Sequence, residues 1–87
     1  MGTGKAVIKL YTLSTCSHCI RAKRFFQENG LEMEFTDVDL LDGAERTRTL
    51  DVVRKLNPEC SFPTICIGEA VIVGFNEERL KKALNIP

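Results

Sequence analysis

Two cysteines with two residues between them, Cys16 and Cys19, form the segment of this chain whose residue types and spacing are best suited to chemistry. A strand pattern ends just before them, near Tyr11, and a helical pattern begins with them. A thiol at the start of a helix faces unpaired backbone N–H groups and the positive end of the helix dipole, and both stabilise a thiolate. We therefore expect Cys16, the more N-terminal and more exposed thiol, to act as a nucleophile. Cys19 lies one turn further on, near enough to resolve a mixed disulfide formed on Cys16.

Ser17 and His18, between the two cysteines, and Thr15, just before them, are expected to tune this pair. His18 is the single histidine of the chain. An imidazole that donates a hydrogen bond or carries a positive charge here stabilises the thiolate, and by linkage it makes a Cys16–Cys19 disulfide more oxidising. A solvated side chain on the first helical turn is the alternative interpretation of His18, and the sequence favours neither.

Metal binding is the main alternative for a C-x-x-C segment. A structural zinc site needs four ligands, and the chain has no second C-x-x-C or H-x-x-H pair. Copper-carrying domains also place C-x-x-C after a first strand, but with a βαββαβ order that this sequence does not predict. We therefore expect no metal site. Cys66, between two isoleucines, is interpreted as a small buried hydrophobic residue, whereas an accessory redox or metal role is left open for Cys60, just before Pro63.

Hydrophobic periodicity predicts the elements that position these residues. Residues 6–11 are apolar and rich in β-branched side chains, as is typical of a central strand covered on both faces. Asn29 and Gly30 end the helix that follows, because glycine accepts the left-handed conformation after a helix. The predicted strands cover residues 6–11, 34–39, 64–67 and 70–73, and the predicted helices cover residues 17–29, 42–56 and 77–84, with Asp42 and Asn76 as N-caps of the last two.

The resulting order is βαβαββα, which predicts an α/β fold with a four-stranded mixed sheet and helices on both faces. The first β-α-β unit should form a right-handed parallel crossover. The last two strands are joined by a tight turn at Gly68 and Glu69 and should form an antiparallel hairpin.

Length and composition limit the function classes that this fold could serve. Eighty-seven residues suit one domain, residues 1–87, in which residues 1–5 are expected to form a flexible N-terminus. Twelve Lys and Arg balance twelve Asp and Glu, so the formal net charge is zero and binding of nucleic acid through its phosphates is disfavoured. No apolar run approaches the ~18 residues of a membrane span, and no signal-peptide cleavage site follows the N-terminus. We expect a cytoplasmic monomer.

A strand, a C-x-x-C segment that opens a helix, and a proline that leads into an antiparallel hairpin together resemble the thioredoxin superfamily. The short chain and the Gly74-Phe75 step before the last helix are similar to glutaredoxins, and the resemblance spans residues 7–84. It implies a thioredoxin-like fold and a thiol–disulfide oxidoreductase whose redox group is a Cys16–Cys19 disulfide, with no other cofactor. It also implies disulfide-containing proteins or low-molecular-weight thiols as partners, and glutathione or a reductase protein as reductant.

Further positions match the family's pattern. Pro63 matches the cis-proline beside the active disulfide, and the backbone of Phe62 would pair there with an extended substrate. Gly74 matches a glycine that approaches the γ-glutamyl end of glutathione, and Asn76 falls near a polar residue at the N-terminus of the same helix. Tyr11 and Thr15 fall on the strand end and loop that shape the thiol pocket. The resemblance thus implies a set of thiol- and substrate-binding residues: Tyr11, Phe62, Pro63, Gly74 and Asn76.

Three departures from the family's pattern concern the reductant. Cys16-Ser17-His18-Cys19 replaces the usual Cys-Pro-Tyr-Cys, so the aromatic wall of the glutathione pocket is lost. Leu13 stands where a lysine commonly meets the glutathione carboxylate. Val73 replaces the first of two glycines, as in redoxins that are coupled to thioredoxin reductase and serve ribonucleotide reductase. We therefore expect disulfide exchange with a donor other than glutathione.

Two other functions are alternatives to this one. The first is a binding module, in which two chains bridge an iron–sulfur cluster through Cys16 and two external thiols. A visible spectrum separates the two, because a cluster is coloured and a dithiol is not. The second is an arsenate-reductase-like relative, which is disfavoured because the extra helical insertion of such proteins is absent.

Overall fold

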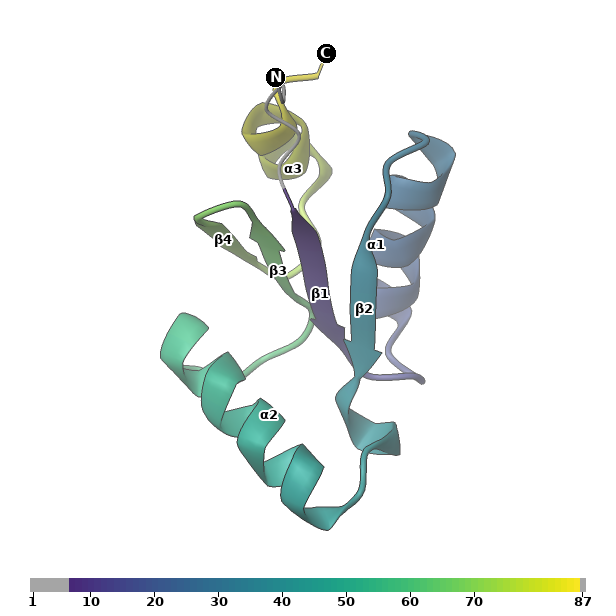
Figure 1. Ribbon diagram of the computed structural model, residues 1–87. Helices are drawn as coiled ribbons and strands as arrows, with labels where there is room; N and C mark the ends of the chain where they lie inside the picture. The colour runs from purple at the N-terminus through teal and green to yellow at the C-terminus, as the bar shows by residue number, and fades with distance from the viewer. Residues whose placement is uncertain (1–6, 87) are drawn as a thin grey trace.

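The computed structural model describes residues 7–86, so the segment predicted to be flexible, residues 1–5, lies outside the described residues. The order of the elements confirms the predicted βαβαββα arrangement (Figure 1). The elements are β1 (Ile8–Thr12), α1 (Ser17–Glu28), β2 (Glu34–Asp37), a short 3-10 helix η1 (Val38–Leu40), α2 (Gly43–Leu56), β3 (Thr64–Ile67), β4 (Ala70–Val73) and α3 (Glu77–Leu84).

The boundaries of two predicted strands are wrong. The first strand was expected over residues 6–11, but Val7 lies before β1 and Thr12 belongs to it. Residues 38 and 39 were expected to continue the second strand, but they begin η1 instead. β2 pairs with β1 only as far as the partners Thr12 and Asp37, where β1 ends. Beyond Asp37 the backbone has no neighbouring strand to pair with, and it closes a 3-10 turn in which the Leu41 N–H donates to the Val38 carbonyl at 3.2 Å.

The four strands form one sheet in the order β2-β1-β3-β4. β1 pairs with β2 in parallel, which is the predicted crossover, and β3 pairs with β4 in the predicted antiparallel hairpin. β1 and β3 are also antiparallel, and their register places Tyr11 opposite Thr64. The C-terminal end of β1, which leads to the cysteine segment, therefore lies beside the start of β3, which follows Pro63.

Helices cover both faces of the sheet, as expected (Figure 1). On one face, alternate side chains of β1 and β3 such as Leu10 and Ile65 pack against Phe26 of α1 and Leu80 of α3, and all four are fully buried. The cluster on the opposite face is smaller. Its buried members are Tyr11, Val38 and Val53, with partly buried side chains around them.

Two of the three helix caps predicted from the sequence are confirmed. The Asn76 side chain accepts a hydrogen bond from the Arg79 N–H at 3.1 Å, and Gly30 after α1 has a left-handed φ of 67°. Asp42 occupies the N-cap position of α2, but its side chain makes no capping hydrogen bond. In the described part of the chain, no helix combines the length and apolar character needed to cross a membrane.

Candidate active site

Cys16 and Cys19 lie at the start of α1, one at its N-cap and one in its first turn. The Cys16 N–H donates to the Leu13 carbonyl at 3.2 Å, which closes the loop after β1, and its carbonyl accepts from the Ile20 N–H at 3.0 Å. Cys16 is partly exposed, whereas Cys19 is fully buried. Both are free thiols. The first cysteine is thus accessible to a substrate and the second is not.

The surroundings of Cys16 favour its thiolate. Burial raises the pKa of Cys16, but the backbone N–H of Cys19, the Cys19 thiol and the backbone N–H of His18 all lower it. The net result is a pKa below the ordinary thiol value. The Cys16 side chain makes no capping hydrogen bond of standard geometry, so the N–H groups act on it mainly as nearby dipoles at the helix N-terminus.

Cys19 is in the opposite electrostatic situation. Burial, together with the hydrogen bond and charge of Cys16, raises its pKa to about 12 against two opposing groups. Those groups are the Leu13 N–H, which donates to the Cys19 sulfur at 3.4 Å, and the positive charge of Lys23. The pair therefore consists of a thiol of lowered pKa at the surface and, beneath it, a thiol that is protonated at neutral pH.

The residues expected to tune the pair lie around it on the surface. Ser17 and His18 are exposed on the first turn of α1, and Thr15 is exposed in the preceding loop. The interaction of His18 with Cys16 that the structure describes comes from its backbone N–H. A role for its imidazole stays a prediction.

The loop before β3 brings Pro63 to the same end of the sheet. The Phe62–Pro63 peptide bond is cis, and Pro63 is buried. The Pro63 carbonyl accepts a hydrogen bond from the Gly74 N–H at 2.8 Å, and Gly74 has a left-handed φ of 81°. Phe62 packs partly buried on the α2 side of the sheet. Pro63 and Gly74 are therefore tied together next to the end of β1.

Two of the predicted binding residues have other described contacts. Tyr11 is 9% exposed in the α2-side cluster, with Lys9 Nζ 5.4 Å from the centroid of its ring. The Asn76 amide oxygen caps α3, as described above, so its hydrogen bond to Arg79 already uses one of its acceptor positions. Both side chains thus have clear structural roles.

The other two cysteines are on the α2 side of the sheet. Cys66 was expected to be buried, but it is partly exposed on β3, because alternate residues of β3 face the smaller, α2-side cluster. Burial still raises the pKa of Cys66. Cys60 has a positive φ of 51°, and its N–H donates to the Asn57 carbonyl at 2.8 Å. Among residues 7–86, no three or more His, Cys, Asp or Glu side chains gather into a group that could hold a metal ion.

A network that orders the loop before Pro63 was missed by sequence reasoning. The Asn57 amide donates to the Ser61 hydroxyl at 3.0 Å and to the Thr64 hydroxyl at 3.2 Å. The Thr64 hydroxyl in turn donates to the Ser61 carbonyl at 2.8 Å. Asn57 is only 3% exposed, so its amide needs hydrogen-bond partners. In the sequence, the one signal of this role was an asparagine directly after a predicted helix.

Lys23 and Asp37 were also missed as neighbours of the thiol pair. Lys23 Nζ lies 2.9 Å from Asp37 Oδ1, and the two residues are fourteen positions apart in the chain. The spacing of four residues between Cys19 and Lys23 was a signal, because it places both on one side of a helix. The contact with Asp37 depends on the register of β2 against β1, which the sequence did not reveal.

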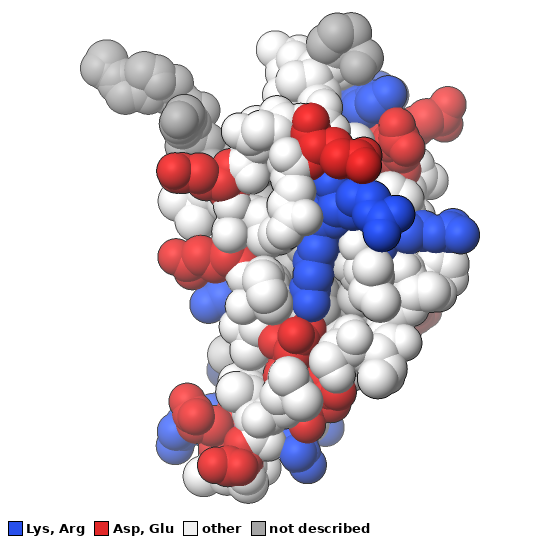
Figure 2. Space-filling view, turned by 90° about the vertical axis from the view of Figure 1, so that its right-hand side faces the viewer, with Lys and Arg blue, Asp and Glu red and all other residues white. Residues whose placement is uncertain are grey.

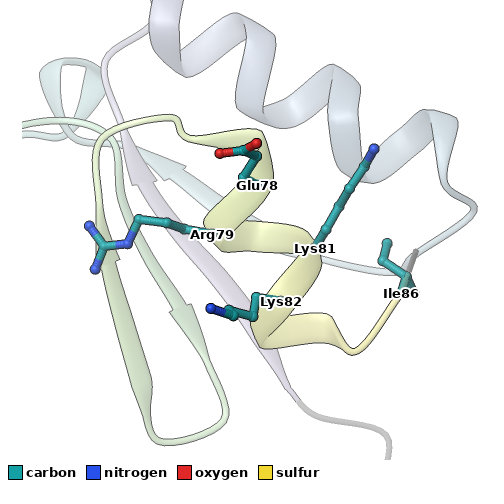
Figure 3. Close-up of a pocket in the computed structure, with 5 residues that line it drawn as sticks. All are labelled: Glu78, Arg79, Lys81, Lys82 and Ile86. Atoms are coloured by element: carbon teal, nitrogen blue, oxygen red, sulfur yellow. The ribbon is translucent and has the colours of Figure 1, made fainter.

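Two surface hollows have no cysteine in their lining. One is on α3 and is lined by Glu78, Arg79, Lys81, Lys82 and Ile86, whose side chains diverge from one another (Figure 3). Another lies between α1 and the start of α3. Figure 2 shows basic side chains in the middle of one face with acidic side chains above and below them. That face carries no extended field of one sign, in keeping with the zero net charge.

Comparison with known proteins agrees with this geometry. Residues 8–72 match the sequence model of the family described as Glutaredoxin. The chain is similar to an uncharacterized glutaredoxin-like 8.6 kDa protein in the rubredoxin operon of Clostridium pasteurianum, with 28% identity over 78 residues, covering 90% of this chain and 97% of that protein.

Two solved structures are more similar in sequence. One is methanoredoxin of Methanosarcina acetivorans, with 36% identity, a TM-score of 0.90 and coverage of 94% of this chain and 87% of that chain. The other is the glutaredoxin of Archaeoglobus fulgidus, with 34% identity, a TM-score of 0.86 and coverage of 93% and 88%. The match therefore extends over nearly all of the described fold.

Proposed function

This chain belongs to the glutaredoxin family, and from that premise we propose that it is a dithiol thiol–disulfide oxidoreductase in which Cys16 attacks and Cys19 resolves. The observation that carries the proposal is the asymmetry of the two thiols. Cys16 is accessible and has a lowered pKa, whereas Cys19 is buried and has a raised pKa. Only the thiolate is the nucleophile in disulfide exchange, so the first step falls to Cys16.

The reaction takes place in two exchanges. The Cys16 thiolate attacks one sulfur of a substrate disulfide, that bond breaks, and the other sulfur leaves as a thiolate. Cys19 then loses its proton and attacks the Cys16 sulfur, which expels the remaining substrate sulfur as a second thiolate. The substrate has gained two electrons and the Cys16–Cys19 pair has lost them. A thiol reductant returns them by the reverse exchanges.

The experiment that tests this proposal separates the two cysteines. Cys19→Ser is expected to accumulate a mixed disulfide through Cys16 with a model protein disulfide, visible as an adduct by intact-protein mass spectrometry. Cys16→Ser is expected to lose exchange altogether, a fall of at least about a hundredfold. Retention of exchange by Cys16→Ser together with its loss in Cys19→Ser would reverse the assignment.

The proposal for the reductant depends on two residues of the sequence, Leu13 and Val73. Leu13 and Val73 replace residues that bind glutathione in the family's pattern, which favours a reductase protein over glutathione as donor. We propose disulfide-containing proteins or small thiols as partners and a reducing, cytoplasmic compartment, where such a pair is kept active. Turnover of the oxidised protein with thioredoxin reductase, and its absence with glutathione and glutathione reductase, is the expected result.

We also propose that the Cys16–Cys19 pair works without a metal or organic cofactor. Both electrons of the exchange are held in one sulfur–sulfur bond, so no other redox group is needed. Protein purified without oxygen is expected to be colourless. A visible band that disappears in Cys16→Ser would support the iron–sulfur alternative instead.

A further inference from the structure

The resolving step needs a thiolate from the buried Cys19. While Cys16 is a thiolate, its hydrogen bond and its negative charge both raise the pKa of Cys19. Both effects end once Cys16 has joined the substrate in a mixed disulfide. Burial then still opposes ionisation, and the groups left to favour it are the Leu13 N–H, 3.4 Å from the sulfur, and the charge of Lys23.

Lys23 is held in a fixed position one turn after Cys19 on α1. Its Nζ lies 2.9 Å from Asp37 Oδ1, and only 17% of the Lys23 side chain and 14% of the Asp37 side chain are exposed. The same Nζ lies 4.0 Å from the centroid of the Phe35 ring. Lysine is rarely buried to this degree without a partner. By contrast, Arg21 and Arg24 of the same helix are exposed.

Asp37 is itself anchored to the strand that leads to the thiols. Its Oδ1 accepts a hydrogen bond of 2.6 Å from the hydroxyl of Thr12, which is fully buried and is its register partner on β1. The next residue, Leu13, donates its N–H to Cys19. The end of β1 therefore holds both Asp37, the partner of Lys23, and the Cys19 sulfur.

We propose that Lys23, clamped by Asp37, is a positioning residue whose positive charge supports Cys19 as the resolving thiolate. The inference rests on the dithiol function proposed above. In the step concerned, the proton of Cys19 passes to water, the new thiolate attacks Cys16 Sγ, and the electron pair of the broken bond leaves on the substrate sulfur. One disulfide forms and one breaks, so no further oxidant or reductant is involved.

The charged groups around this step are few. Cys16 and Lys23 act on Cys19 from α1, and Asp37 of β2 acts on Lys23. Asp39 of η1 is engaged with Ser14, whose N–H and hydroxyl donate to its carboxylate at 2.9 Å and 2.6 Å. The sign of each substitution then follows from charge: removal of the lysine charge disfavours the Cys19 thiolate, and removal of the carboxylate favours it.

A stopped-flow measurement with a symmetric chromogenic aryl disulfide separates the two exchanges. The first aryl thiolate is released at a rate proportional to reagent concentration, when Cys16 attacks. The second is released at a rate independent of concentration, when Cys19 resolves. The trace of Cys19→Ser, which contains only the first release and any reaction of Cys60 and Cys66, is subtracted. The second phase is recorded across pH for each variant.

Lys23→Gln is expected to slow the second phase about three- to tenfold at pH 7 and to move its pH midpoint upward, with the first phase unchanged within about twofold. Lys23→Arg keeps the charge and is expected to restore the rate within about twofold. Asp37→Asn keeps an oxygen for Lys23 and Thr12, and is expected to move the midpoint downward. Arg24→Gln removes the same charge from the neighbouring exposed position and is the matched control, with both phases unchanged.

Two results would overturn the inference. One is a second phase that Lys23→Gln leaves unchanged. The other is equal slowing by Lys23→Gln and Asp37→Asn with no movement of either midpoint, which is the signature of a merely structural role. A parent protein with no second phase at all would instead contradict the dithiol function, so the two failures are distinguishable.

Discussion

Cys16 and Cys66 carry the same thiol group, but their surroundings shift its pKa in opposite directions. Cys16 stands at the N-terminus of α1, where the N–H groups of His18 and Cys19 and the Cys19 thiol together outweigh burial and lower its pKa. Cys66 stands on β3, where burial raises its pKa despite the charge of Lys9. Both thiols are partly exposed, so the lower pKa of Cys16 comes from its surroundings at the start of α1 and not from greater exposure.

The largest expected consequence is selective alkylation. With iodoacetamide at pH 7, we expect Cys16 to be modified at least about tenfold faster than Cys66, because its thiolate fraction is greater. Peptide mass mapping over a time course measures both rates in one sample. In denaturant the two rates should converge to within about twofold, since the helix no longer exists. Equal rates in the folded protein would remove the contrast between the two regions.

The pH dependence of the same reaction sharpens the comparison. The Cys16 rate should be half-maximal below the ordinary thiol value of ~8.5, and it should fall only when the pH drops below that midpoint. The Cys66 rate should still be rising above pH ~8.5. A Cys16 midpoint at or above the ordinary value would contradict the role of the helix N-terminus.

Replacement of Cys66 tests its structural role. Cys66→Ala should leave exchange unchanged within about twofold and reduce the free energy of unfolding at pH 7 by about 1 kcal/mol, as expected for a small, partly buried side chain. Its folded pKa is raised, so the stability contributed by its protonated form is full below the unfolded value of ~8.5 and is lost as pH rises through the folded value.

Urea unfolding at pH 7 and pH 10 measures both effects. The fall in stability between these two pH values should be smaller in Cys66→Ala than in the parent, because one group with a raised pKa has been removed. A steeper fall in the variant would show that the sign assigned to Cys66 is wrong.

Features that are local in the chain could be predicted from the sequence, whereas contacts between distant residues could not. The thiol pair and its helix are local in the chain, so the spacing of Cys16 and Cys19 and the periodicity after them were sufficient to predict both. Contacts between side chains on different strands were harder to predict. Thr12 and Asp37 are twenty-five residues apart and meet only through the parallel register of β1 and β2, which periodicity does not determine.

The misjudged strand end has a related cause. Alternation of polar and apolar residues continues to residue 39, but pairing stops where β1 stops. A strand needs a neighbour as well as a pattern, and the length of that neighbour lies elsewhere in the sequence. Cys66 was placed too deep for a similar reason, since the thickness of the layer over it depends on how α2 packs.

The smallest expected effect concerns His18. Its imidazole and the N–H groups of the helix N-terminus are two different explanations for the lowered pKa of Cys16. The imidazole is exposed, so a hydrogen bond or charge interaction with Cys16 is expected to contribute about 0.5 to 1 kcal/mol. For a two-electron couple this corresponds to about 10 to 20 mV. Stabilising the thiolate stabilises the reduced protein, so the parent should have the less negative reduction potential and the lower Cys16 pKa.

Equilibration of the parent and His18→Ala with a dithiothreitol redox buffer measures the difference in reduction potential, and alkylation across pH measures the difference in Cys16 pKa. The backbone N–H of residue 18 is present in both proteins, so any difference belongs to the imidazole. Ser17→Ala is the matched control, because it changes the neighbouring exposed side chain without removing an ionisable group, and its potential should equal that of the parent. Equal potentials for the parent and His18→Ala would assign the whole of the tuning at this position to the backbone and leave the imidazole as a solvated side chain.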